Sequence, residues 1–262
     1  MTAEMEGALQ AAGEENKKKK RKAADRALVM LSGGLDSATC LYWARSRNYE
    51  TSAITFNYFG RLEKEKQAAR LVAEKAGVHV TEVDLSFMKE AADFRGGDNN
   101  GSSSSSSNNN NNRDGRWDSY VPARNMIFYS IAAHYAEYAG VRWIVGGHNS
   151  HDVSFFKDAS RGYIEKLNAL FREGCLLCDG NNGAGAGTGR LQEPYQIVLP
   201  LADLDRKGVV ELALELGVPI GQTWSCHGDG GSHCGRCYAC VQRLKAFASL
   251  GLQDPVFPRG RA

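Results

Sequence analysis

Residues 27–37 read ALVMLSGGLDS, a short apolar run followed by a turn of serine and glycine. Five apolar residues in succession are typical of a strand that is buried on both faces of a parallel sheet. The small residues after the turn favour a helix over residues 37–46. This stretch therefore predicts a strand, a glycine-rich loop and a helix, in that order.

The rest of the chain repeats the alternation of strand and helix. Runs rich in β-branched and aromatic residues predict further strands, and periodic apolar positions predict the helices between them. The strands are expected over 51–58, 78–83, 143–147 and 197–201, and the helices over 62–76, 126–138 and 205–216. Asp203 or Asp205 is available as the cap of the last helix. This order indicates a doubly wound, parallel α/β sheet of the Rossmann-like class.

Length and composition narrow the class of protein. A chain of 262 residues with 42% hydrophobic residues can bury a sizeable core. It has no apolar run near the ~20 residues of a bilayer span, which excludes a membrane-spanning protein. Residues 1–22 carry six basic and four acidic side chains, which leaves 26 of each for the rest of the chain. This balance of charge in the rest of the chain does not favour nucleic acid as a partner.

Three segments of low complexity divide the chain. Residues 1–24 contain a KKKKRK run and lack the apolar core of a signal peptide, so we expect a disordered basic tail rather than a nuclear-localisation or nucleic-acid signal. Insertions near residues 96–115 and 179–190 are rich in serine, asparagine and glycine, and such tracts belong in surface loops. The remainder reads as one α/β domain over residues 25–222, followed by a cysteine-rich segment and a terminal helix over residues 223–252.

The loop SGGLDS at residues 32–37 has the features of a phosphate-binding turn. Backbone amides at a helix N-terminus are unpaired and favour an anion. Gly33 and Gly34 leave the backbone free to take a positive φ and to approach a phosphate closely. A carboxylate beside bound phosphates requires a cation, so Asp36 is a natural ligand for Mg²⁺. The loop lacks both the Gly-Lys-Ser/Thr ending of P-loop NTPases and the third glycine of the dinucleotide fingerprint.

Four of the seven cysteines crowd into the stretch CHGDGGSHCGRCYAC. Overlapping C-x-x-C steps and a glycine-rich arch bring four thiolates around one point, which is typical of a structural zinc site; an iron–sulfur cluster is the alternative. The expected ligands are Cys226, Cys234, Cys237 and Cys240. His227 and His233 adjoin cysteines and are not expected to be ligands. Cys40, Cys175 and Cys178 are not assigned to the metal site. Clustered thiols without a secretory signal favour a reducing, cytoplasmic compartment.

Placed between a strand and a helix, SGGLDS resembles the pyrophosphate loop of the PP-loop ATP pyrophosphatases, which adenylate an acceptor and release pyrophosphate. Together with VPARN at residues 121–125 and the cysteine knuckle, it makes residues 27–247 similar to the 7-cyano-7-deazaguanine synthase (QueC) family. The resemblance implies an adenine nucleotide alpha hydrolase-like fold that uses ATP, Mg²⁺ and Zn²⁺. It further implies a ligase that converts 7-carboxy-7-deazaguanine and ammonia into the nitrile 7-cyano-7-deazaguanine through adenylated intermediates, in queuosine or archaeosine biosynthesis.

The resemblance also assigns residues to the nucleotide. The expected nucleotide-binding residues are Leu31, Ser32, Gly33, Gly34, Leu35, Asp36, Ser37, Ala38, Thr39, Cys40 and Leu41. Asp36 and Arg124 are expected to be catalytic, because adenylation builds negative charge on phosphate. Arg124 follows Pro122 at the start of a helix, where its fork of donors suits a phosphate or carboxylate; a surface arginine in a turn is the alternative. Asn125 is available as a helix cap.

Substrate recognition is expected in the loop GHNSHDVSFFKD at residues 147–158, because loops at the carboxyl ends of parallel strands line the ligand crevice. The family pattern there is close to Gly-x-Asn-x-x-Asp-x-Ser-x-Tyr-Pro-Asp-Cys-Arg. The chain departs from it at Phe156, Lys157, Ala159 and Ser160, and it has Gly60 and Leu62 where a Gln and a His usually follow the second strand. The expected substrate residues are Tyr58, Arg61, Arg124, Asn149, Asp152 and Asp158. Capping of the loop is the alternative role of the two aspartates.

Two other functions fit the same loop. One is a related PP-loop enzyme that adenylates a tRNA base. The equal numbers of basic and acidic residues beyond the N-terminal tail disfavour it. The other is a zinc-stabilised nucleotide-binding module without catalysis. The sequence leaves open whether the chain forms a homo-oligomer, whether ammonia arrives free or from a partner glutaminase, and which nucleoside is the end product.

Overall fold

The computed structural model describes residues 25–89, 121–175, 193–228 and 230–257. Its centre is a parallel five-stranded sheet in the order β3-β2-β1-β4-β5. The strands are β1 (Arg26–Met30), β2 (Glu50–Tyr58), β3 (Val80–Leu85), β4 (Trp143–Val145) and β5 (Gln196–Val198). The basic tail, both low-complexity insertions and Cys178 lie outside the described residues.

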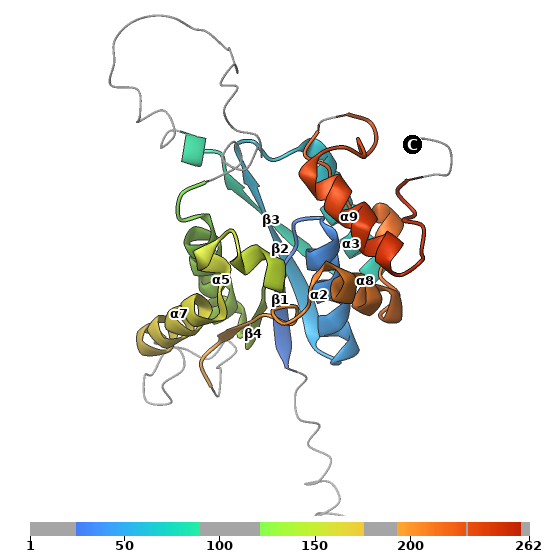
Figure 1. The fold of residues 1–262 in the computed structure, drawn as a ribbon. Helices are drawn as coiled ribbons and strands as arrows, with labels where there is room; N and C mark the ends of the chain where they lie inside the picture. Colours follow the sequence, from blue (N-terminus) through green and yellow to red (C-terminus); the bar gives the residue numbers. More distant parts are fainter. Residues whose placement is uncertain (1–24, 90–120, 176–192, 229, 258–262) are drawn as a thin grey trace, which may run out of the picture.

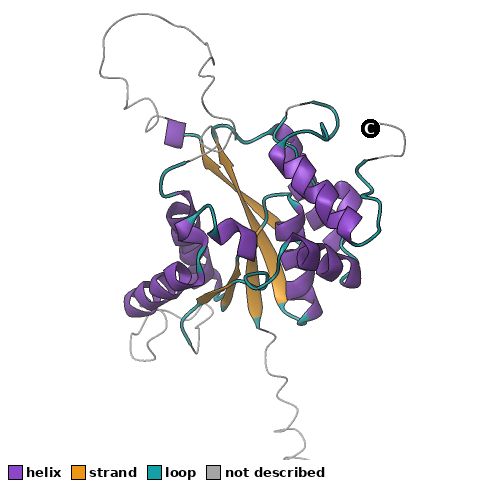
Figure 2. Ribbon diagram, viewed as in Figure 1, coloured by secondary structure: helices purple, strands orange, loops and turns teal. Residues whose placement is uncertain are grey.

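Helices cover both faces of this sheet, as Figures 1 and 2 show. On one face lie α5 (Arg124–Ala139) and α7 (Arg161–Gly174), and on the other lie α2 (Leu35–Ser46), α3 (Glu63–Ala76), α8 (Arg206–Glu215) and α9 (Tyr238–Ser249). Shorter elements are α6 (Ser150–Val153) and the 3₁₀ turns η1 (Lys157–Ala159) and η2 (Ile220–Gln222). The doubly wound parallel α/β fold predicted from the sequence is confirmed.

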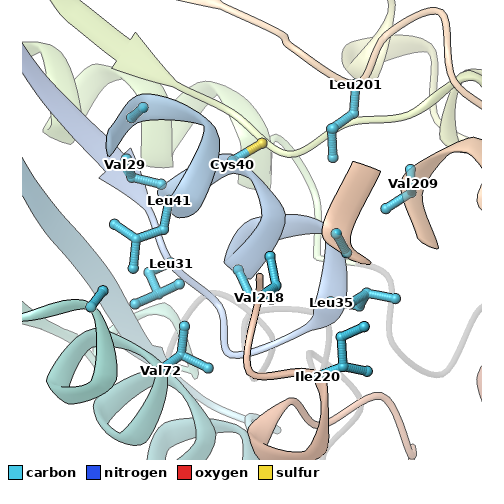
Figure 3. Close-up of a cluster of buried hydrophobic side chains, with 14 of the residues drawn as sticks. Val29, Leu31, Leu35, Cys40, Leu41, Val72, Leu201, Val209, Val218 and Ile220 are labelled. Carbon is cyan, nitrogen blue, oxygen red and sulfur yellow. The ribbon is translucent and has the colours of Figure 1, made fainter. Parts of the chain in front are cut away.

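The central strand β1 divides the interior into two cores. Side chains alternate along a strand, so Val29 packs among α2, α3 and α8, whereas Leu28 packs on the opposite face with α5 and α7. Figure 3 shows the first core, in which Leu31 lies near Leu41 of α2 and Val72 of α3. A strand that is buried on both faces holds the start of the following loop firmly in place.

Helix α7 was not predicted from the sequence. It is amphipathic, with Ile164 and Leu167 buried against the sheet, but it lies between a polar loop and a low-complexity insertion. Asn168 fixes it to the edge strand: its amide group donates to the carbonyl of Ile197 (3.0 Å) and accepts from the amide of the same residue (2.7 Å). The helix thus covers the edge strand β5, which would otherwise leave backbone groups unpaired.

The ends of two elements differ from the prediction or decide between its alternatives. Asp205 caps α8 by accepting a hydrogen bond from the amide of Gly208 (2.8 Å), whereas Asp203 pairs with Arg161 on the surface. Strand β4 ends at Val145, so the two glycines after it belong to the loop. In the part of the chain that the structure describes, no helix has the length and apolar character needed to cross a membrane.

Candidate active site

A cavity of about 380 Å³ opens at the carboxyl ends of the strands. It lies where the strand order reverses, because β2 follows β1 on one side while β4 pairs with β1 on the other. Open α/β sheets bind their ligands at this switch point. The loop after β1, the loop after β4 and the starts of α5, α8 and α9 supply the walls.

The phosphate loop depends on one glycine more than on the other. Gly33 has φ +95° and packs against α3 so closely that a Cβ would lie 2.3 Å from the carbonyl oxygen of Glu65. Gly34 has φ −75°, so of the two glycines only Gly33 takes a positive φ. At this second position there is room for a side chain, since a Cβ would lie 3.5 Å from the Ser32 hydroxyl.

The loop folds back on the first turn of α2. The hydroxyls of Ser32 and Ser37 lie 3.0 Å apart, and the amide of Ser32 donates to the Ser37 hydroxyl (3.2 Å). The helical hydrogen bonds of α2 begin with the amide of Ala38, which donates to Gly34 (3.0 Å). The amides before it form a helix N-terminus at the cavity, which favours an anion.

Arg61 holds this loop from the side of β2. Its guanidinium donates to the carbonyl oxygens of Phe56 (2.5 Å) and Ser32 (2.9 Å), and it lies 3.9 Å from the carboxylate of Glu65. The side chain is only 3% exposed. Although Arg61 lines the cavity, its donors are used to join β2 to the phosphate loop.

Asp36 faces the opposite side of the cavity and meets the loop after β4. The amide group of the fully buried Asn149 donates to its carboxylate (3.0 Å). Burial raises the pKa of Asp36 to about 6, and the nearby Asp152 carboxylate adds to this, while Arg206 and the hydrogen bond from Asn149 act in the opposite direction. A carboxylate with a raised pKa is poorly compensated by the protein and is therefore suited to a cation.

Asn149 owes its position to the short helix α6. Its side chain accepts from the amides of His151 (2.9 Å) and Asp152 (3.2 Å), and the Asp152 carboxylate accepts from the amide of Asn149 (3.2 Å). This reciprocal arrangement is a capping box. It fixes the amide group of Asn149 against Asp36 and leaves Asp152 4.0 Å from Arg206.

The wall beside β4 is built mainly by α5. Arg124 is half-buried at the start of this helix, directly after Ala123, whose φ of +53° turns the chain into the helix. Asn125 is not a cap: it is buried within the first turn and lines the cavity. Phe128 stacks on Phe56 with ring centroids 4.3 Å apart, which gives the wall a flat aromatic surface.

The structure places the predicted substrate residues in two groups. Tyr58, Arg61 and Arg124 line the cavity, whereas Asn149, Asp152 and Asp158 are not among its lining residues. Of the predicted nucleotide residues, those that line the cavity are Leu31, Ser32, Gly34, Leu35, Asp36 and Ser37. Gly33 lies against α3, and Ala38, Thr39, Cys40 and Leu41 are buried within α2.

Sequence reasoning missed cavity residues that come from distant segments. Arg206 begins α8, His148 follows β4, and Arg243 comes from the middle of α9. Arg243 is buried and its guanidinium is occupied: it pairs with Asp254 (2.6 Å) and donates to the Thr223 hydroxyl (2.7 Å). Arg206 and Arg243 lie outside the motifs found in the sequence, whereas His148 lies in the loop expected to recognise the substrate, at a position that the family pattern leaves open.

The four cysteines of the C-terminal segment form a candidate metal centre. The sulfur atoms of Cys226, Cys234, Cys237 and Cys240 all lie within 4.8 Å of one another, and all four cysteines are free of disulfides. Four thiolates at ~2.3 Å from one zinc ion would be about 3.8 Å apart. A small decrease in the sulfur–sulfur distances would therefore allow these cysteines to coordinate one zinc ion tetrahedrally.

Backbone amides support the same assignment. Those of Gly228 (3.3 Å) and Cys234 (3.4 Å) donate to the sulfur of Cys226, and that of Cys237 donates to the sulfur of Cys234 (3.3 Å). Such donors offset the charge of metal-bound thiolates. His233 has another role, since its Nε2 accepts from the amide of Ser225 (3.1 Å).

The metal centre lies close to the cavity. The amide of Trp224, two residues before the first cysteine, donates to the carbonyl of Gly33 in the phosphate loop (2.9 Å). The hydroxyl of Tyr238, next to Cys237, lies 3.1 Å from the Nε2 of His151 in α6. The cysteine segment therefore contacts both loops that carry the site.

Comparison with known proteins agrees with this geometry. The profile of the family described as "Queuosine biosynthesis protein QueC" matches residues 26–251. The 7-cyano-7-deazaguanine synthase of Cyanothece sp. (strain PCC 7425) is 38% identical over 237 residues, which are 87% of this chain and 97% of that protein. The synthase of Thermosynechococcus vestitus is also 38% identical, over 88% of this chain and 94% of its own length.

Among solved structures, the NMN synthetase of Francisella tularensis is similar, with 16% identity and a TM-score of 0.46 over 97% of this chain and 88% of that one. The likeness in sequence is far stronger and extends over nearly the whole length of the curated relatives. On the match of the family profile and these relatives, the chain belongs to the QueC family, the family of 7-cyano-7-deazaguanine synthases.

Proposed function

We propose that this chain is an ATP-dependent carbon–nitrogen ligase that converts 7-carboxy-7-deazaguanine and ammonia into 7-cyano-7-deazaguanine. The observation that carries the proposal is the phosphate loop SGGLDS at the N-terminus of α2, with Asp36 facing a cavity at the switch point of the sheet. Family membership supplies the acceptor. The alternative acceptor, a tRNA base, is not favoured by these relatives.

The reaction needs two transfers of AMP. A carboxylate oxygen attacks the α-phosphorus of ATP and pyrophosphate leaves; ammonia then attacks the acyl carbon, AMP leaves with that oxygen, and an amide forms. In the second step the amide oxygen attacks the α-phosphorus of another ATP, pyrophosphate leaves, and loss of AMP and two protons gives the nitrile. Both oxygens of the carboxyl group therefore end in AMP.

The residues of the cavity suit these steps. The amides at the start of α2 and the hydroxyls of Ser32 and Ser37 bind the phosphates, and Arg61 keeps the loop in place. Arg124 faces the same cavity and stabilises the negative charge that develops during each transfer. The flat surface of Phe128 accommodates the deazaguanine ring.

Two metal ions complete the proposal. Asp36, half-buried and held by Asn149, is the residue that would hold Mg²⁺, which supplies charge neutralisation between the carboxylate and the phosphates. The four cysteines would hold Zn²⁺, which cross-links the C-terminal segment. An iron–sulfur cluster would instead give a coloured protein with acid-labile sulfide.

The function is tested with purified protein, ATP, Mg²⁺, ammonium and 7-carboxy-7-deazaguanine. Mass spectrometry should detect the nitrile, and AMP release should depend on the deazaguanine. An Asp36→Ala variant that keeps its metal content is the matched control and should form neither product. Folded wild-type protein that leaves the deazaguanine unchanged would refute the proposed reaction, and AMP release that requires tRNA instead would support the other acceptor.

A further inference from the structure

His148 carries a polar atom that the fold leaves unsatisfied. The residue lies in the loop that follows β4 and is one of the residues that line the cavity. Its Nε2 is buried and has no hydrogen-bond partner among the described residues. Buried polar atoms are almost always paired in folded proteins. An atom of this kind in the wall of a binding cavity is therefore expected to find its partner in a ligand.

The position of His148 between the two halves of the cavity indicates which ligand. The preceding Gly147 lies against α2, where a Cβ would be 3.3 Å from the amide of Ser37, so the phosphate loop is immediately beside it. The α5 residues Arg124 and Phe128 line the same cavity, and the neighbouring α5 residue Tyr129 contacts the imidazole. A group held against this wall would have its reacting end at the phosphates and its ring system beside the imidazole.

The imidazole packs against α5, and its surroundings favour the neutral form. The ring of Tyr129 meets it edge to face, with centroids 5.9 Å apart. Burial lowers the pKa of His148, and Arg124 acts in the same direction, while Asp152 and Asp158 oppose it. A neutral imidazole has one nitrogen that donates and one that accepts, which suits the uncharged edge of a heterocycle rather than a phosphate.

We propose that His148 is a specificity-determining residue, whose Nε2 forms a hydrogen bond with the edge of the deazaguanine ring while the carboxyl group of the substrate faces the phosphate loop. The inference rests on the proposed function and extends it to a residue outside the predicted substrate set. His148 takes no part in bond making. Its contribution is to the affinity for the acceptor, not to the affinity for ATP.

The test compares two amide side chains of different reach. In His148→Gln the side-chain nitrogen reaches the place of Nε2, whereas in His148→Asn it falls short. We expect KM for 7-carboxy-7-deazaguanine to rise about tenfold in His148→Asn, which is the loss of one buried hydrogen bond, and to return close to wild type in His148→Gln. KM for ATP should stay unchanged in both variants.

Tyr129→Phe is the matched control. It removes another buried atom without a partner among the described residues, the Tyr129 hydroxyl, which lies outside the cavity wall. Both KM values should be unaffected in this variant. An unchanged acceptor KM in His148→Asn, or an increase in the KM for ATP, would overturn the inference.

A binding measurement distinguishes a failure of the His148 inference from a failure of the proposed reaction. Calorimetry of 7-carboxy-7-deazaguanine without ATP should show the same order of affinity, wild type and His148→Gln above His148→Asn. Wild-type protein that binds the deazaguanine but forms no nitrile would refute the reaction and leave the His148 comparison valid. Wild-type protein that does not bind it would refute both.

Discussion

The ionised carboxylate of Asp36 destabilises the folded, ligand-free protein. Its pKa is about 6 in the folded chain, against 3.8 for an ordinary aspartate. Because the folded state binds this proton more tightly, the free energy of unfolding falls as the pH rises from about 4 to about 6. Above that range the ionised carboxylate costs about 2 kcal/mol, after allowance for its partial exposure.

Replacing Asp36 by Asn should therefore stabilise the ligand-free protein. We expect the free energy of unfolding in urea to rise by about 1–2 kcal/mol at pH 7.5, with almost no gain at about pH 3, where the aspartate is largely protonated in both states. Mg²⁺ and ATP should stabilise the wild type more than Asp36→Asn. An equal gain at both pH values would show that the carboxylate is not the cause.

Alanine substitutions at Gly33 and Gly60 distinguish the effect of backbone strain from the effect of steric overlap. Both have a positive φ, but a Cβ at Gly33 would overlap the backbone of α3, whereas nothing lies within 4 Å of a Cβ at Gly60. We expect Gly60→Ala to lower the stability by about 1 kcal/mol. Gly33→Ala should lower it by more than ~3 kcal/mol and abolish ATP binding. Similar losses in urea unfolding would contradict the close contact with α3.

Among the elements, α9 and its contact with α6 are expected to depend on a metal ion bound by the cysteine cluster. Cys237 is the residue before α9, and Tyr238 carries the hydroxyl that meets His151. Metal analysis should find about one equivalent per chain. Removal by a chelator, or the substitution Cys237→Ser, should increase hydrogen exchange in the first turns of α9 and in α6, while β1 and β2 keep their protection. Unchanged exchange in α9 after loss of the metal would contradict this role.

Local sequence patterns predict elements that depend on local causes. Strand β1, the phosphate loop and α2 follow from an apolar run, two glycines and a helix start, and the cysteine cluster follows from its spacing. Helix α7 was missed because its amphipathic pattern adjoins low-complexity sequence and its position depends on Asn168 bonding to a distant strand. Asn125, for which a helix cap was one alternative, instead lies within the first turn of α5 and lines the cavity.

At the scale of the whole molecule, the site exists because segments far apart in sequence meet at one edge of the sheet. Gly147 fits against α2, Trp224 bonds to Gly33, and Asn149 bonds to Asp36. Sequence motifs indicate the phosphate loop and the loop after β4, whereas Arg206 and Arg243 are recognised as cavity residues only in the folded chain. The cavity thus forms where the phosphate loop meets the loop after β4 at the switch point of the sheet.

We propose that this cavity activates a carboxylate by adenylation. The most direct measurement follows 7-carboxy-7-deazaguanine labelled with ¹⁸O in its carboxyl group through complete turnover, with mass spectrometry of AMP and pyrophosphate. We predict one ¹⁸O atom in each AMP, two AMP for each nitrile, and no label in pyrophosphate. Unlabelled AMP together with labelled pyrophosphate or inorganic phosphate would show that the carboxylate oxygen does not attack the α-phosphorus of ATP.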